Sequence, residues 1–184
     1  MKRFHGILAV LTTAFCLSWW AAAGPIRPGQ AKRYDVSDEA MTMSGIERIQ
    51  IQVAEIPTLL QELGIKKKRV RALLQSHLVA SGIKVDEDPD LPRLSLLLVV
   101  GDDPTKPDDL AMTVIVAVHQ KVLLERLNLR LTAPTVSLSK ASLVSRRDAS
   151  RKLGGEVLAV VDQLVRIIQI ATKEAERVNL ETDG

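Results

Sequence analysis

The stretch LSLLLVVGDDPTKPDDLAMTVIVAVHQKVLL, residues 94–124, decides the fold. It begins with an aliphatic run, residues 94–100, that is too short for an independent helix. Prolines and a glycine bound this run, which predicts a strand buried on both faces. Beyond the turn GDDPTKPDD, aliphatic side chains recur at every second position from Met112 to Val118. This period of two predicts a further strand over residues 110–124.

Upstream of this stretch the sequence predicts a strand followed by a helix. In residues 46–56, IERIQIQVAEI, aliphatic side chains alternate with Arg and Gln, as in a strand with one wet face. In residues 66–83, KKKRVRALLQSHLVASGI, apolar side chains recur at helical spacing from Val70 to Leu78. Gly82 fits the left-handed position just beyond a helix end.

Downstream, the sequence predicts one more strand and a long helix. Residues 127–138 alternate again, and Pro134 within them suits an edge strand or a bulge because proline has no N–H to donate. Residues 153–178 keep an i, i+3, i+4, i+7 apolar rhythm. Gly154 and Gly155 each weaken this helix by roughly 1 kcal/mol relative to alanine, so we expect it to be loose or bent there.

The resulting order is strand, helix, three strands, helix, which predicts an α+β fold within residues 45–180. The first two strands are expected to be parallel, because a helix connects them, and the next two short connections make an antiparallel meander. The expected architecture is a two-layer α/β sandwich, with a mixed four-stranded sheet and two helices on one face.

The N-terminus predicts export. Residues 1–23 combine Lys2 and Arg3, an uncharged apolar run and a final Ala-Ala-Ala, which is the order of a cleavable signal peptide. The alternative is a retained membrane anchor, but the apolar run is shorter than the roughly 20 residues of a spanning helix. Residues 24–44, with two prolines and mixed charge, are expected to form a flexible lead-in. The predicted location is periplasmic or secreted, with no transmembrane anchor after cleavage.

Loss of the signal changes the composition of the chain. The only cysteine, Cys16, leaves with it, so about 160 residues must fold without a disulfide. Tyr34 is then the sole aromatic residue, and the core must be aliphatic. The formal charge falls from +3 to +1 because Lys2 and Arg3 are removed. This balance gives no support to nucleic-acid binding.

Three short motifs carry a resemblance. They are SGI (residues 81–83) before an acidic loop, TAPTVS (residues 132–137), and VVDQLV (residues 160–165) in the long helix. Together with the element order, they resemble a family of small exported bacterial proteins of uncharacterised function. The order is more loosely similar to small α/β envelope domains such as the N-terminal domain of the Tol system's periplasmic propeller protein, which implies partner binding by analogy of fold.

The densest charge cluster is the basic run Lys66, Lys67, Lys68, Arg69 and Arg71. It lies at a predicted helix start, where the helix dipole disfavours cations. One interpretation is an interaction patch for an acidic envelope partner or an anionic surface such as phospholipid head groups. The alternative is an ordinary solvated helix face. The run is too short and too poor in aromatic residues to indicate nucleic acid.

No motif for catalysis, a cofactor or a metal is present in the sequence. The acidic loops at residues 86–90 and 102–109 lack the ligand order of a calcium loop. His77 and His119 have no second ligand at metal-binding spacing. The serines from Ser137 to Ser145 form neither G-x-S-x-G nor S-x-x-K.

Two functions remain as hypotheses. The first is a non-enzymatic interaction or accessory module of the envelope, which binds a partner protein or a second copy of itself. A homodimer would use outward side chains such as Ile115 and Ala117, with either Leu97 or the pair Leu96 and Leu98. The second is an enzyme or small-ligand binder whose site assembles only in the fold, near His119. A pocket joining His119 to two carboxylates would favour the second, and an exposed apolar sheet face the first.

Overall fold

The computed structural model describes residues 35–103 and 105–182. The predicted signal peptide and the first part of the lead-in lie outside the described residues. The elements follow one another in this order: α2 (Asp38–Met41), β1 (Arg48–Val53), α3 (Thr58–Glu62), α4 (Lys67–Ala80), β2 (Lys84–Val85), β3 (Arg93–Asp103), β4 (Lys106–Leu124), the 3-10 helix η1 (Glu125–Leu127), β5 (Leu129–Ser145) and α5 (Ala149–Thr182).

The described strands form one mixed sheet in the order β2-β1-β3-β4-β5. Strand β1 is parallel to both β2 and β3, whereas β3, β4 and β5 form an antiparallel meander. The predicted fold class and the parallel pairing through a helical crossover are therefore confirmed. The sheet has five strands, one more than expected, because Lys84 and Val85 pair with β1. A two-residue strand is too short to show a period in the sequence.

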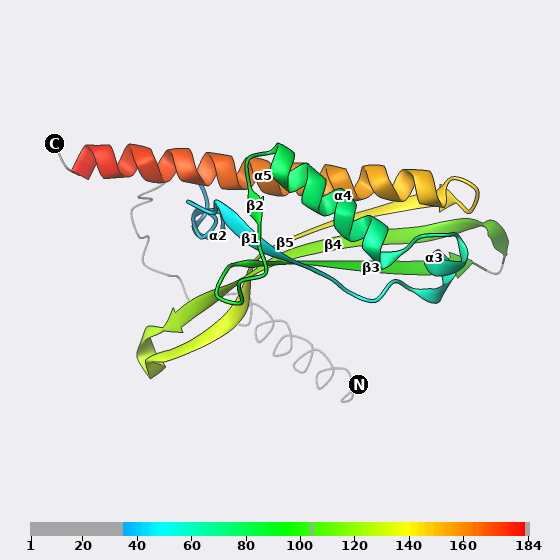
Figure 1. Ribbon diagram of the computed structural model, residues 1–184, viewed down its shortest axis with the longest axis horizontal. Coiled ribbons are helices and arrows are strands. Elements are labelled where there is room, and N and C mark those ends of the chain that lie inside the picture. Colours follow the sequence, from blue (N-terminus) through cyan, green and yellow to red (C-terminus); the bar gives the residue numbers. More distant parts are fainter. Residues whose placement is uncertain (1–34, 104, 183–184) are drawn as a thin grey trace, which may run out of the picture. The chain divides into compact units, whose positions relative to one another are not determined.

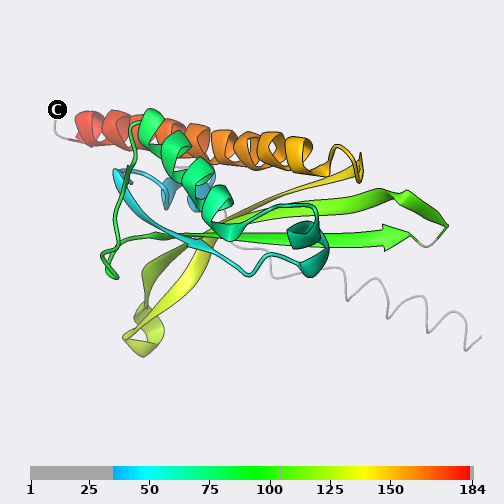
Figure 2. The same ribbon diagram turned by 45° about the vertical axis from the view of Figure 1, so that its right-hand side comes forward.

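Helices α4 and α5 cover one face of this sheet, as the two views in Figure 1 and Figure 2 show. Leu94, Leu96 and Leu98 of β3 point into this layer and are at most 2% exposed. The prediction that residues 94–100 are buried on both faces is wrong, since Leu97 is 43% exposed and Val99 is 47% exposed. Among the described elements, helices cover only one side of β3, and Leu97 and Val99 on the other side are exposed.

Pro134 interrupts the pairing of β4 with β5, as predicted. The register passes from Val118 opposite Val136 to His119 opposite Pro134, so Thr135 is an extra residue on β5. The Thr135 hydroxyl donates to the carbonyl of Val118 at 3.2 Å. Strand β5 is also an edge strand of the described sheet. Edge strands and bulges are the places in a sheet where the missing N–H of proline is tolerated.

Helix α5 runs unbroken from Ala149 to Thr182, through Gly154 and Gly155. Its buried stripe includes Val157, Val161 and Leu164, each no more than 1% exposed, which face the sheet. Tertiary burial of this stripe offsets the poor helix propensity of the two glycines.

Part of the segment expected to be a flexible lead-in is ordered. Ser37 caps α2 by accepting a hydrogen bond from the Ala40 N–H at 3.2 Å, and Met43 is fully buried in the core. Gly45 then turns into β1 with φ of +71°, a conformation that glycine adopts without strain. The core therefore begins before residue 45, the first residue of the predicted domain.

Candidate functional site

The uncovered face of the sheet presents an apolar centre between polar flanks. Leu97 of β3 lies opposite Ile115 of β4, and Val99 lies opposite Thr113. Cross-strand partners share one face, so these four side chains form adjacent rows. Leu143 on β5 extends the apolar area and is 73% exposed. Polar side chains flank these rows, among them Gln50 and Gln52 on β1 and Ser137 and Ser139 on β5.

The hairpin that joins β4 to β5 exposes leucines at its tip. It projects from the rest of the sheet in Figure 1 and Figure 2. Leu124 lies opposite Leu129, and the two are 41% and 50% exposed. Leu127 in η1 is 60% exposed, and Asn128 closes the turn in the left-handed region with φ of +47°. These leucines are a second apolar surface that alternation alone did not identify.

The predicted basic patch divides into paired and unpaired cations. Lys67 forms an ion pair with Glu55, and Arg71 binds both Glu87 and the carbonyl oxygen of Ile51. Within the described residues, Lys66, Lys68 and Arg69 form no ion pair, and Arg69 lines a groove against α5. Two of the five cations are therefore paired within the fold, and the role of the five as an interaction patch stays a prediction.

The acidic segments bind basic side chains of β1, of β4 and of the turn before α5. Asp86 pairs with Arg48, Asp90 with Lys121, and Asp102 with Arg146. The hydrogen bond from Arg48 lowers the pKa of Asp86, and the hydrogen bond from Lys121 lowers the pKa of Asp90. These loops fasten the ends of the strands. No group of three or more His, Cys, Asp or Glu side chains converges in a metal-binding arrangement within residues 35–103 and 105–182.

His119 lies in a small polar cavity of about 50 Å³. Its Nε2 is 3.0 Å from the Ser95 hydroxyl, which donates to the carbonyl of Ala117 at 3.2 Å and can accept from Nε2–H. Arg93 and Lys121 also line the cavity, and its described lining holds no carboxylate. Pockets for drug-sized ligands commonly measure roughly 300–1,000 Å³, so this cavity is well below that range.

His77 joins the two covering helices. Its Nε2 lies 2.7 Å from Asp162 Oδ1, across the α4–α5 interface. The His77 side chain is one-quarter exposed. This contact holds α4 against α5 and gives His77 a structural role.

A groove of about 840 Å³ lies between α4 and the N-terminal half of α5. Its floor includes the buried side chains of Val70, Leu153 and Val157. Three arginines line it, namely Arg69 on α4, Arg147 in the turn before α5, and Arg151 in the first turn of α5. The sequence indicated only Arg69, because the other two lie some eighty positions away and isolated arginines give no signal.

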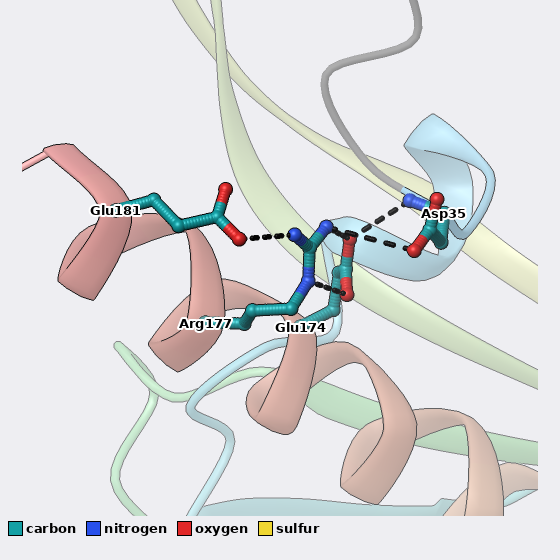
Figure 3. Close-up of polar contacts among 4 residues, drawn as sticks. All are labelled: Asp35, Glu174, Arg177 and Glu181. Carbon is teal, nitrogen blue, oxygen red and sulfur yellow. Dashed lines mark hydrogen bonds and ion pairs between the residues drawn. The ribbon is translucent and has the colours of Figure 1, made fainter.

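A buried carboxylate fastens the first described residue to α5 (Figure 3). Glu174, 9% exposed, accepts the backbone N–H of Asp35 at 2.8 Å. Arg177 donates to both carboxylate oxygens of Glu174, at 2.6 and 3.0 Å, and its other terminal nitrogen reaches Glu181 at 2.6 Å. The Arg177 guanidinium, followed by the Asp35 N–H, lowers the pKa of Glu174 to about 2. Both glutamates in turn raise the pKa of Arg177.

Among the described helices, none combines the length and the apolarity needed to cross a membrane.

Comparison with known proteins finds neighbours among solved structures alone. No protein-family model and no curated protein matches the sequence. A minor lipoprotein from Acinetobacter baumannii is 18% identical, with a TM-score of 0.34, over 72% of this chain and 95% of that one. The rare lipoprotein B from Shewanella oneidensis is 16% identical, with a TM-score of 0.37, over 73% of this chain and 98% of that one. These structural neighbours of the chain are bacterial lipoproteins.

Proposed function

We propose that the protein is a non-enzymatic interaction module of the bacterial cell envelope, which binds a partner protein through the uncovered face of its sheet. The observation that carries this proposal is the apolar centre on that face, where Leu97 and Val99 are more than 40% exposed. Contiguous apolar surface with a polar rim is typical of protein interfaces. The envelope location rests on the signal-like sequence of residues 1–23.

The cavity at His119 and the exposed sheet face both favour an interaction module over an enzyme. A site for an enzyme near His119 would need a pocket that joins this histidine to two carboxylates. The described cavity at His119 measures about 50 Å³ and has no acidic side chain in its lining. An interaction module would need an exposed apolar sheet face, and Leu97, Val99 and Leu143 provide one. Both observations support the module.

Site-specific crosslinking in intact cells tests the proposal. A photo-crosslinking amino acid replaces Leu97 in a C-terminally tagged chain, and the matched control carries it at Gln75, an exposed position on α4. We expect a discrete adduct from position 97 and none from position 75. An adduct at twice the monomer mass identifies the partner as a second copy of this chain. Recovery of uncrosslinked monomer from position 97 contradicts the proposal.

A second pair of variants separates the sheet face from the basic patch. Val99→Glu, combined with the crosslinker at position 97, is expected to abolish the adduct because it buries a charge in the interface. Lys66→Glu with Lys68→Glu is expected to leave the adduct intact, since both lysines lie on the helical layer. Loss of the adduct in the lysine variant alone would assign the contact to the basic patch instead.

A further inference from the structure

We infer that the groove between α4 and α5 binds an anionic amphiphile with a single aliphatic chain and a carboxylate head, such as a fatty acid. The groove belongs to the helical layer, whereas the proposed protein interface lies on the opposite face of the sheet. It is therefore a second site, independent of the first. The inference rests on the shape of the groove, its apolar floor and its excess of positive charge.

The groove exists because the two helices diverge. Helix α4 contacts α5 near its C-terminal end, where His77 bonds to Asp162, and its N-terminal end lies away from α5 in Figure 1 and Figure 2. Gly154 stands at the narrow part, where an added Cβ would lie 3.9 Å from Leu73 Cδ2. A larger side chain at position 154 would enter the space between the helices. The absence of a side chain at this position thus keeps the groove open.

The floor of the groove suits an aliphatic chain. Val70, Leu153 and Val157 are at most 5% exposed, and the partly exposed Leu73 lines the same space. The volume of about 840 Å³ falls within the roughly 300–1,000 Å³ of ligand pockets. The mouth of the groove carries positive charge, since three of the residues that line the groove are arginines.

These arginines lie where positive charge is least stabilised. A helix N-terminus favours acidic side chains in its first turn, yet neither α4 nor α5 has one there. Arg69 lies in the first turn of α4, and Arg151 in that of α5. Arg151 pairs with Asp148 at 2.8 Å, whereas Arg69 and Arg147 form no ion pair within the described residues. Asp148, directly before α5, already supplies a carboxylate at that helix end. An anion at the mouth would pair with the two guanidinium groups that form no ion pair, and it would lie near the N-terminus of α4.

A carboxylate fits this arrangement better than a cationic or neutral head. The guanidinium group presents N–H donors in a planar fork that matches the two oxygens of a carboxylate. One aliphatic chain can then lie along the floor between the helices. An acidic peptide would also meet the charge, and the experiment distinguishes it.

Isothermal titration calorimetry of the purified protein with laurate, below its micelle concentration, tests the inference. We expect saturable one-to-one binding of laurate. Butyrate, with the same head and almost no chain, and dodecyltrimethylammonium, with the same chain length and a cationic head, are expected to bind at least about tenfold more weakly. Equal binding of laurate and the cationic amphiphile would overturn the inference, as would saturable binding of an acidic peptide without binding of laurate.

Three variants locate the site. Gly154→Leu fills the groove and is expected to abolish laurate binding, whereas the matched Gly154→Ala retains it, because a Cβ at this position makes only ordinary contact. Ala72→Trp blocks the groove from the exposed surface of α4, so it keeps the test valid if Gly154→Leu fails to fold. Arg69→Gln with Arg147→Gln is expected to weaken binding about tenfold. Unchanged affinity in Ala72→Trp and in the double arginine variant contradicts the inference.

Discussion

The backbone N–H of Asp35 donates to Oε1 of Glu174 at 2.8 Å, although the two residues are 139 positions apart. This bond ties the start of the described chain to the C-terminal half of α5. Arg177 donates to the same oxygen, Oε1, and also to Oε2 of this carboxylate. The contact therefore depends on both an ion pair and a fixed backbone.

We predict that Glu174→Gln loosens the segment before β1. The amide has no charge, so the ion pair with Arg177 is lost. If its oxygen keeps the position of Oε1, its NH₂ group faces the Arg177 Nε–H, donor against donor, and that hydrogen bond is lost as well. Hydrogen exchange should become faster at Asp35 and in α2, with little change in β3 and β4. Glu176→Gln, an exposed neighbour on the same helix, is the control. Equal exchange in the two variants would show that the bond does not hold the segment.

We predict a loss of stability in acid. The pKa of Glu174 is lowered from 4.5 to about 2, and those of Asp86 and Asp90 are also lowered. A carboxyl group with a lowered pKa in the folded state contributes stability that is fully present above its unfolded pKa and is lost as the pH falls through the folded pKa. The melting temperature should therefore fall between pH 4.5 and 2. Glu174→Gln should show a shallower fall, and a parallel one would exclude Glu174 as a contributor.

A pair of neighbours on α4 tests the position of the core. Leu78 is fully buried, whereas Val79 is 56% exposed. Leu78→Ala is expected to lower the free energy of unfolding by about 2–5 kcal/mol through the lost apolar contact and the cavity. Val79→Ala should change it by no more than about 0.5 kcal/mol. Urea denaturation measures both, and a reversed order would mean that α4 is rotated about its axis.

Two glycines should respond in opposite directions to the same substitution. Gly154 lies inside α5 with room for a Cβ, so Gly154→Ala is expected to stabilise the protein by about 0.5–1 kcal/mol. Gly82 follows α4 with φ of +87°, where a side chain is strained, so Gly82→Ala should destabilise it by about 1–2 kcal/mol. Urea denaturation gives both values. Destabilisation by Gly154→Ala would indicate that a Cβ at position 154 lies closer to Leu73 than the expected 3.9 Å.

The sequence predicts the elements that have a long, clear period. Alternation from Met112 to Val118 and the helical rhythm after Leu153 both correspond to observed elements, and Pro134 marks the bulge. Helix α3 and strand β2 were not predicted, because five and two residues are too few to establish a period. A purely aliphatic run has no period either. The sequence therefore could not show that Leu97 is on an open face.

The candidate sites were less predictable than the fold. The basic run drew attention to Arg69, but the groove also needs Arg147 and Arg151, which the fold brings near α4. Isolated arginines in a turn and a helix have no pattern of their own. The exposed sheet face depends on which side of the sheet the helices cover. The period of two in a strand does not show which side that is.

The bulge at Thr135 also protects the outer strand of the sheet. An uninterrupted edge as long as β5 would offer a continuous row of backbone groups to another chain and would invite aggregation. Pro134 removes one N–H from that row, and the extra residue breaks its regular spacing. The bulge therefore shortens the regular stretch of edge with which another strand could pair.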